Sequence, residues 1–346
     1  MKKKPNTRKP TPKALVGQDR LIRRLRLETS DFKRKYGQLL SEHERLEKRH
    51  DAMLAKRVKP GEIKLSPTSK RDDEAVAIAV LSDWHIEEDI RSNSSNFGNE
   101  FSLAIAKKRS EECFVNVVKL LRQEQFSVEI NTLVVALLGD FINGNIHDEL
   151  MESNLLLPME AMLMAEELIE AGINYLLKHT DVKLVFPCCA GNHSRITRKQ
   201  RIATEYGNSL ETIMYHHLAK RFARQDRVRF IIADSYHLYF PVYDNYTIRF
   251  HHGHQLRFQG GVGGLYIPAR KAIAQWQKIR RADLDVFGHF HNLKMDGDLF
   301  ICNGSLVGYN DFALSIKADF EKPKQSFFLV DRKRGKTGFY PIVFSS

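Results

Sequence analysis

The chain has 346 residues, of which 42% are hydrophobic, so it is long enough for one large domain and an appendage and too apolar for a disordered protein. Its longest apolar runs, such as 133–138, are far too short to cross a bilayer, and no apolar segment follows the basic residues 2–4, so no secretory signal is expected. None of the four cysteines forms a C-x-x-C pair, which favours reduced core thiols in a reducing compartment.

The net charge of +12 is concentrated in the first fifth of the chain. Residues 1–71 hold 22 Lys and Arg against 8 Asp and Glu, whereas residues 72–346 hold 32 against 34. Such an asymmetric basic arm predicts contact with a polyanion, with nucleic acid as the first candidate. The alternative is a solvated segment that only aids solubility.

The basic arm contains a helical pattern. Residues 1–16 are rich in Lys, Pro and Thr and are expected to lack fixed structure, whereas 18–57 predict a helix. An apolar seam recurs every seven residues, at Leu25, Phe32, Leu39, Leu46 and Met53. The positions three residues earlier are mixed: Ile22, Thr29, Tyr36, His43 and His50. The pattern leaves open a weak coiled coil, hence a homo-oligomer, or a helix that packs on something else.

A linker is expected at 58–73, so the predicted domains are an arm, 1–71, and a second domain, 72–346. From residue 75 onward, apolar runs of strand length alternate with helical segments. Strands are expected at 75–81, 132–138, 183–189, 228–233, 236–241, 246–251, 284–287, 299–302, 325–330 and 338–344. Helices are expected at 103–123, 158–178, 204–224 and 268–281. This order predicts an α/β fold with a mixed sheet.

Five short polar signatures follow apolar runs along this domain. They are Asp83-Trp84-His85, Gly139-Asp140, Gly191-Asn192-His193, His252-Gly253-His254 and Gly288-His289-Phe290-His291. Each alone could be a helix cap, a turn or surface histidines. Together they supply Asp, Asn and His at the carboxyl ends of strands, where α/β sheets bind ligands. The set predicts a site for two divalent metals, which usually serves the hydrolysis of phosphate esters.

In this order the five signatures resemble the calcineurin-like metallophosphoesterase superfamily, over about residues 75–310. The stretch 139–149 resembles a bacteriophage-associated branch of it, and SbcD-type DNA-repair nucleases are distantly similar. The resemblance implies a mixed β-sandwich flanked by helices and a centre of two divalent metals, with manganese first and iron, zinc, magnesium or nickel as alternatives. It also implies a cytoplasmic location in a bacterial or phage-infected cell.

The resemblance implies a role for each site residue. Asp83, His85 and His291 would hold the first metal, and Asp140 would bridge both. The second metal would be completed by Asn192, His252 and His289. His193 would not be a ligand, but would stand beside the phosphate as the general acid for the leaving oxygen or as a charge stabiliser. Arg195 and His254 are the expected substrate contacts.

Some assignments stay open. His251 and His254 compete with His252, which is placed first because the ligand of the family comes first in H-G-H. Ser194 stands where many members carry an acidic residue that orients the general acid, a role that Asp148 could take. The acidic or Asn residue usual soon after G-D has two candidates here, Asn143 and Asn145. The glycine-rich run 260–264 is expected to be an active-site lid, a phosphate contact or a simple turn.

Three functions are compatible with these features. The favoured one is a nuclease-like phosphoesterase, because the basic arm adds polyanion affinity to a centre that cleaves phosphodiesters. The second is a phosphatase of a phosphoprotein or a small phosphoester. The third, from another class, is a metal-stabilised scaffold without activity that binds nucleic acid or a protein partner.

Overall fold

The computed structural model describes residues 12–55, 73–91, 98–146, 152–258, 264–310, 313 and 319–344. The chain divides into two compact units, 1–67 and 68–346, each of which is described by itself. The predicted linker lies outside the described residues except for its last residue, so the domain boundary at residue 71 stays a prediction. The glycine-rich run 260–264 also lies outside them except for its last residue.

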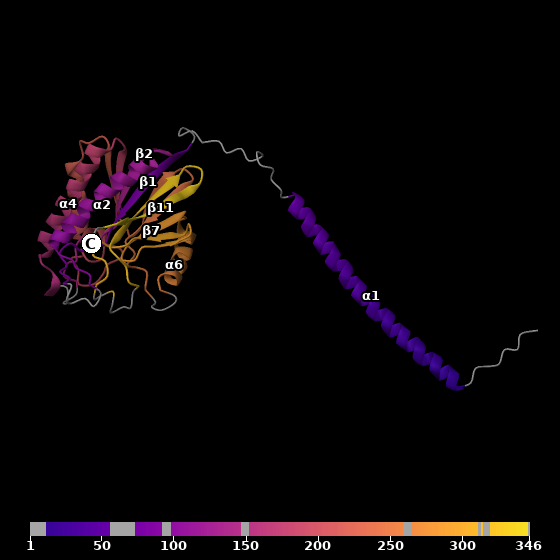
Figure 1. Ribbon diagram of the computed structural model, residues 1–346. Helices are drawn as coiled ribbons and strands as arrows, with labels where there is room; N and C mark the ends of the chain where they lie inside the picture. The colour runs from indigo at the N-terminus through magenta and orange to yellow at the C-terminus, as the bar shows by residue number, and fades with distance from the viewer. Residues whose placement is uncertain are drawn as a thin grey trace, which may run out of the picture. The chain divides into compact units, whose positions relative to one another are not determined.

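The first unit contains one long helix, α1, Pro12–Ala55 (Figure 1). It begins six residues before the predicted helix and ends two residues before its predicted end. No proline follows Pro12 within α1, and ion pairs one turn apart, such as Arg24 with Glu28 at 2.9 Å, support the exposed helix. Every α1 side chain whose exposure is described is exposed to solvent.

The second unit contains two β-sheets. The first sheet has the strand order β11-β10-β1-β2-β3-β4, in which β1 to β4 run parallel and β10 pairs antiparallel with both β1 and β11. Its strands are β1 Glu74–Leu81, β2 Glu129–Leu137, β3 Lys183–Cys188, β4 Val228–Ile232, β10 Lys324–Asp331 and β11 Gly335–Val343.

The second sheet has the order β5-β6-β7-β9-β8, with a parallel centre formed by β6, β7 and β9. Its strands are β5 Leu238–Tyr243, β6 Tyr246–Phe250, β7 Leu284–Phe287, β8 Lys294–Asp296 and β9 Phe300–Cys302. The short edge strand β8 was not expected from the sequence, because its three residues carry no apolar run.

The helices of this unit are α2 Leu103–Glu124, α4 Pro158–His179, α5 Leu210–Arg221 and α6 Tyr266–Ile279, with a 3₁₀ turn, η1, at Tyr206–Asn208. The predicted start of a helix at residue 204 is wrong. Two main-chain hydrogen bonds, from Ile196 to the Asn208 carbonyl and from Leu210 to the Ser194 carbonyl, tie this segment to the loop after β3. The helix can begin only after that pairing ends. No helix among the described residues is long and apolar enough to span a membrane.

The sheets and helices stack in layers, and strand β1 shows how. Alternate side chains of a strand point to opposite faces. Ala77, Ala79 and Leu81 belong to the core that α2, α4 and α5 cover, whereas Ile78 and Val80 belong to the core between the two sheets. A third core joins the second sheet to α6 (Figure 1). The predicted mixed β-sandwich flanked by helices is therefore confirmed.

Candidate metal centre

The predicted site residues lie in loops that directly follow parallel strands of both sheets. Asp83 follows β1, Asp140 follows β2 and Asn192 follows β3, while the loops after β6 and β7 carry the histidines. Hydrogen bonds join the sheets here: the main-chain N–H of His289 donates to Asp83 Oδ1 at 2.9 Å. The carboxyl ends of the two sheets therefore meet at one place.

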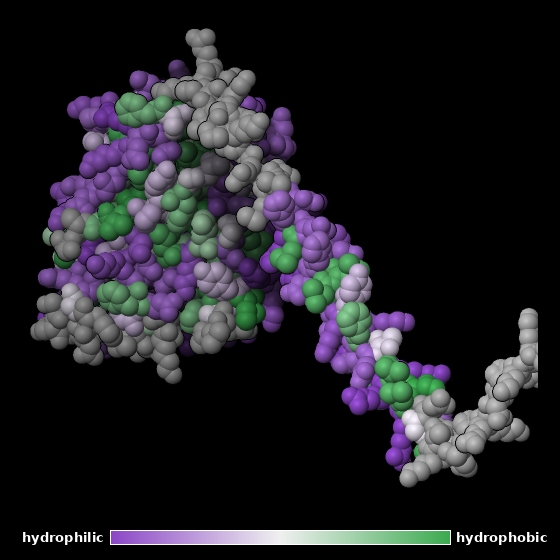
Figure 2. All heavy atoms as spheres, turned by 45° about the vertical axis from the view of Figure 1, so that its right-hand side comes forward, coloured by the Kyte–Doolittle hydropathy of each residue, from purple (hydrophilic) through white to green (hydrophobic). Residues whose placement is uncertain are grey.

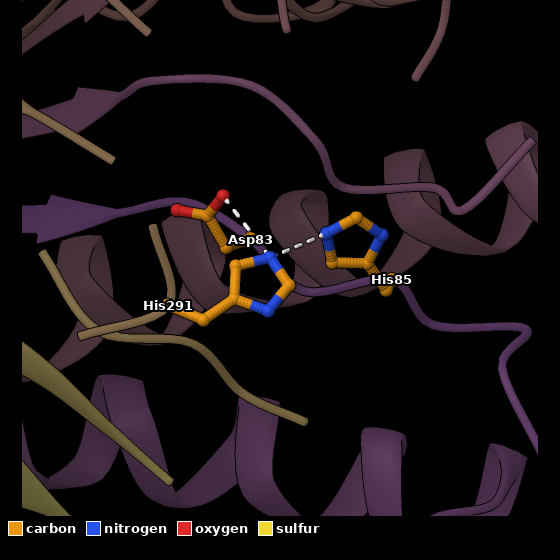
Figure 3. A group of neighbouring side chains, drawn as sticks. All are labelled: Asp83, His85 and His291. Carbon is orange, nitrogen blue, oxygen red and sulfur yellow. Dashed lines mark hydrogen bonds and ion pairs between the residues drawn. The ribbon is translucent and has the colours of Figure 1, made fainter. Parts of the chain in front are cut away.

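A first group of donor atoms consists of Asp83, His85 and His291, whose ligand atoms all lie within 4.8 Å of one another (Figure 3). His85 Nε2 lies 3.0 Å from His291 Nε2, which lies 3.6 Å from Asp83 Oδ1. Burial raises the pKa of the Asp83 carboxyl to about 8 and lowers the pKa of His291 to about 4. Asp83 and His85 are buried, and the His291 side chain is 16% exposed.

The tautomer of His85 is fixed by Asn143. His85 Nδ1 lies 3.0 Å from Asn143 Oδ1, and Asn143 Nδ2 donates to Asn154 Oδ1 at 2.8 Å, which sets the direction of the amide. Because an amide oxygen only accepts, Nδ1 of His85 carries the proton. Its Nε2 therefore presents a lone pair to the donor group, as a metal-ligating histidine does.

A second group consists of Asp140, His252 and His289. His252 Nε2 lies 2.8 Å from Asp140 Oδ2 and 3.1 Å from Asn192 Oδ1, while His252 Nδ1 donates to the Leu138 carbonyl at 2.7 Å. If His252 were neutral, its Nε2 would be an acceptor. It would then face two other acceptors, Asp140 Oδ2 and Asn192 Oδ1, with no hydrogen atom between them. Although burial opposes it, the Asp140 carboxylate raises the pKa of His252 to about 10, so a proton can supply the positive charge that a metal would bring.

Asp140 belongs to both neighbourhoods. Besides its contact with His252, it forms a third group with His85 and His193. Burial alone would raise the pKa of Asp140, but His252 and His193 hold it well below its ordinary value. Asp140 is therefore shared by the second and third groups, and His85 links the third group to the first.

The competing histidines have other polar partners. His251 is fully buried, with Nδ1 3.2 Å from the Tyr236 hydroxyl and Nε2 3.6 Å from Asp285 Oδ1. His254 Nε2 lies 2.9 Å from Glu205 Oε1, and its side chain is only 2% exposed. The donor groups found among the described residues contain His252 and neither competitor. The structure also does not bring His254 to solvent, where a substrate would meet it.

His193 is oriented by the main chain. Its N–H donates to Asp140 Oδ1 at 2.8 Å, and its ring Nδ1 donates to the Asn143 carbonyl at 2.7 Å. This leaves Nε2 4.0 Å from Asp140 Oδ2 on a side chain that is 17% exposed. The carbonyl of Asn143 thus takes the orienting role for which Ser194 is unsuited, while Asp148 lies outside the described residues.

The remaining candidates lie around this centre. The Arg195 guanidinium donates to the carbonyls of Asn192 at 2.8 Å and Thr197 at 3.2 Å, which holds its side chain along the loop after β3. Asn145 is exposed, and among the described residues it is Asn143 that contacts the site histidines. Ser194 instead lies 2.7 Å from the Ser209 hydroxyl, beneath the loop.

In the part of the chain that the structure describes, left-handed backbone at residues other than glycine is confined to this site. Among the described residues, five that are not glycine have a positive φ, and all five are predicted ligands: Asp83, His85, Asp140, His289 and His291. Side chains other than Gly rarely adopt this conformation, which costs about 1–2 kcal/mol per residue. Such strain collects at functional sites because the surrounding structure holds it in place.

Two glycines of the signatures allow the loops to approach one another. A Cβ on Gly191 would collide with Asp140 Oδ1 and with its main-chain nitrogen. A Cβ on Gly288 would collide with the Asp83 carboxylate. Glycine is therefore required beside both carboxylates because the backbone itself packs against them.

Two buried carboxylates hold the ligand loops, and reasoning from the sequence missed both. Glu211 accepts from the N–H of Phe141 at 2.8 Å and of Gly191 at 2.7 Å, and so links the loops after β2 and β3. Glu87 accepts from the N–H of Asn143 at 2.8 Å and of Gly144 at 2.7 Å. Burial raises the pKa of each to about 7.

A signal for Glu211 was present in the sequence. It lies three, four and seven residues before Met214, Tyr215 and Leu218, so it shares the buried face of α5. A carboxylate on an apolar face must find hydrogen-bond donors, and here the donors are the ligand loops.

Comparisons with known proteins give fold-level likenesses only. No family model matches the chain, and no curated protein matches it. Among solved structures, a dimetal phosphatase from Danio rerio is 12% identical with a TM-score of 0.37, over 79% of this chain and 100% of that one. The calcineurin-like phosphoesterase YfkN from Bacillus subtilis is 12% identical with a TM-score of 0.31, over 79% and 93%.

A candidate 5′-nucleotidase from Staphylococcus aureus, in complex with alpha-ketoglutarate, is 10% identical with a TM-score of 0.32, over 79% of this chain. The chain spans 55% of the length of that protein. At these identities and scores the likenesses carry no conclusion about activity, which depends on the geometry of the site.

Replacing Glu211 with Gln should loosen the site. An amide can accept only through its one oxygen and would turn its NH₂ group toward a main-chain N–H, at a cost of about 1–3 kcal/mol. We expect a lower thermal midpoint and weaker binding of divalent metal, measured by calorimetry and by metal titration. Glu167→Gln, at an exposed position of α4, is the matched control. Metal affinity equal to that of the unaltered protein would show that Glu211 does not position the ligands.

Proposed function

We propose that the protein is a dinuclear metal-dependent phosphoesterase, a hydrolase acting on phosphodiester bonds. The observation that carries the proposal is a set of three linked donor groups: His85 belongs to the first group and to the third, and Asp140 belongs to the third and to the second. His85 presents a lone pair to its group, and His252 would present one once a metal displaced its proton, because Asn143 and the Leu138 carbonyl accept from their other ring nitrogens. Convergent acceptors without donors are what a cation site requires.

The residues present fit two divalent ions. Asp83, His85 and His291 would hold one, Asn192, His252 and His289 the other, and Asp140 would touch both. Imidazole combined with carboxylate suits manganese, iron, zinc or nickel, and the oxygen ligands also admit magnesium. We place manganese first. Bound ions would supply an activated water and neutralise the phosphoryl oxygens.

The side chains then divide the remaining work. His193 Nε2 faces the donor groups and solvent, so it can give a proton to the leaving oxygen, while the Asn143 carbonyl holds the ring in the required tautomer. The main-chain bond from His193 to Asp140 ties the acid to the bridging carboxylate. Arg195, held along the same loop, is the cation placed to meet a phosphate from the side of Asn192.

We propose nucleic acid as the substrate. The arm carries the whole positive excess of the chain, and every side chain of α1 described in the structure is exposed. A basic, exposed helix adds affinity for a polyanion by releasing its counterions. The distant likeness to SbcD-type nucleases that the sequence suggests agrees with this substrate class.

Two other functions stay as alternatives, and one assay separates the three. A phosphatase would hydrolyse phosphomonoesters and ignore nucleic acid, and a scaffold would bind metal and hydrolyse nothing. We would supply manganese to the purified protein and compare single-stranded DNA, double-stranded DNA, RNA, an aryl phosphodiester and an aryl phosphomonoester. Cleavage of the phosphomonoester alone would replace the nuclease proposal with the phosphatase.

Asp140→Asn should remove both metal binding and activity. The amide keeps the size of the side chain but loses the charge and one of the two oxygen ligands. We expect fewer bound metal ions per chain by elemental analysis and no measurable hydrolysis. Asp244→Asn, at an exposed turn, is the control that changes the same charge. Unaltered metal content in the Asp140 variant would refute the bridging role.

His193→Ala should keep the metals and lose most of the rate. An acid catalyst contributes typically 10²–10⁴-fold, and a ring oriented by a neutral carbonyl in place of a carboxylate should lie near the lower end. The loss should shrink for aryl esters with good leaving groups, which need less protonation. We would compare nitrophenyl with phenyl phosphodiesters, with the exposed His217→Ala as control. An equal loss on both esters would contradict the acid role.

Replacing Arg20, Arg23 and Arg24 with Gln should weaken nucleic-acid binding in the full chain. Three lost duplex contacts would flatten the slope of log affinity against log salt by up to about 2.7. Hydrolysis of a small aryl phosphodiester should not change, because no predicted ligand lies in α1. Lys119, Lys178 and Lys220, exposed on α2, α4 and α5, give the matched triple control. Identical slopes for all three proteins would show that the arm is not the anchor.

A further inference from the structure

The apolar seam of α1 is exposed within the unit that contains it. Its members Leu25, Phe32, Leu39 and Leu46 are 52%, 71%, 70% and 58% exposed. Figure 2 shows hydrophobic residues spaced along the visible face of this helix. A continuous exposed apolar surface of this kind marks an interaction site, and a seven-residue repeat on a helix suits a second helix.

We propose that α1 pairs with α1 of a second copy of this chain as an antiparallel coiled coil. In the proposed register Leu25 faces His50 of the second copy, and Phe32 faces His43 of the second copy. The same register places Thr29 opposite Leu46 and Tyr36 opposite Leu39. Each layer occurs twice because the pair is symmetric.

The layers favour this direction over a parallel pair. In a parallel coiled coil each residue faces its own copy, so Thr29 would meet Thr29, and His43 and His50 would each meet themselves inside the seam. Burying polar groups against one another without donors for every acceptor is costly. The antiparallel register instead places each of these three beside an apolar side chain and leaves its polar end near the edge.

The charges that flank the seam favour the same register. In an antiparallel coiled coil, residues beside the seam meet residues of the same flank on the second helix. The charged pairs formed in the proposed register are Glu28 with Arg49, Lys35 with Glu42 and Arg26 with Glu47. All three join opposite charges, and each forms twice in the dimer.

Other registers bring like charges together. A parallel pair sets Glu42 beside Glu47, with one compensating contact between Glu28 and Lys33. Sliding the antiparallel pair by seven residues sets Lys35 beside its own copy in one direction and Glu42 beside its own copy in the other. Only the proposed register among these four has complementary charge throughout. Since Arg20, Arg23 and Arg24 lie outside its seam and flanks, polyanion binding stays compatible with it.

Disulfide trapping tests the direction. The four native cysteines are buried, so new ones in α1 can be followed in the full chain. Leu25→Cys and His50→Cys would be made in chains of different tag size, mixed and oxidised mildly. We expect a disulfide-linked heterodimer from the mixture. Leu25→Cys alone should give none, because two copies of residue 25 would lie about 37 Å apart at 1.5 Å per residue.

Charge exchange tests the register without cysteines. Glu28→Lys and Arg49→Glu should each weaken self-association about tenfold in sedimentation experiments, because two attractive pairs become repulsive. The double variant should regain the original dissociation constant within about threefold. Arg45→Glu, on the outward face, is the matched control and should change little.

The results that would overturn the proposal are distinct. A disulfide dimer from Leu25→Cys alone would show a parallel pair. Absence of rescue in the double charge variant would show another register. A monomeric full-length protein at tens of micromolar would show that something other than a second copy covers the seam, such as the second unit of the same chain.

Discussion

The site depends on burying one carboxylate, Asp140, with its charge intact. An isolated buried charge is costly, so the surroundings must supply donors or cations on every side. One oxygen receives the His193 main-chain N–H, and the other faces His252. The loop after β3 can come this close only because residue 191 has no side chain. Three features place these groups around the charge of Asp140. They are the convergence of the two sheets, the glycine beside the carboxylate and the two buried glutamates that hold the loops.

The core of the fold could be predicted from the sequence, because it rests on local patterns. Alternating and continuous apolar runs gave the strands of both sheets within a few residues, and Pro158 marked the start of α4 as expected. The errors arose where tertiary contacts decide. α5 begins late because the residues before it form main-chain hydrogen bonds with the loop after β3. β8 forms because its residues pair with β9 at the edge of the second sheet. Neither contact can be predicted from the spacing of apolar residues along the chain.

The members of the donor groups could also be predicted, because Asp and His residues follow the strand ends in the sequence, and the structure brings them together. What surrounds them could not be. The partner that orients His193 is a main-chain carbonyl, which any residue could provide, so searching for an acidic side chain at 148 could not find it. Which of three neighbouring histidines enters the site depends on the turn at Gly253. The sequence order alone cannot show which way each ring points.

The left-handed backbone at five predicted ligands has a consequence for how such a protein would change if its activity were no longer selected. At these positions glycine would relieve the conformational strain while deleting the metal donor, so loss of function and gain of stability coincide. A lineage released from catalysis should accumulate glycine or asparagine at 83, 85, 140, 289 and 291 sooner than at 192 or 252, whose backbones are unstrained. The distribution of glycine among related chains would then reveal which of them have ceased to be enzymes.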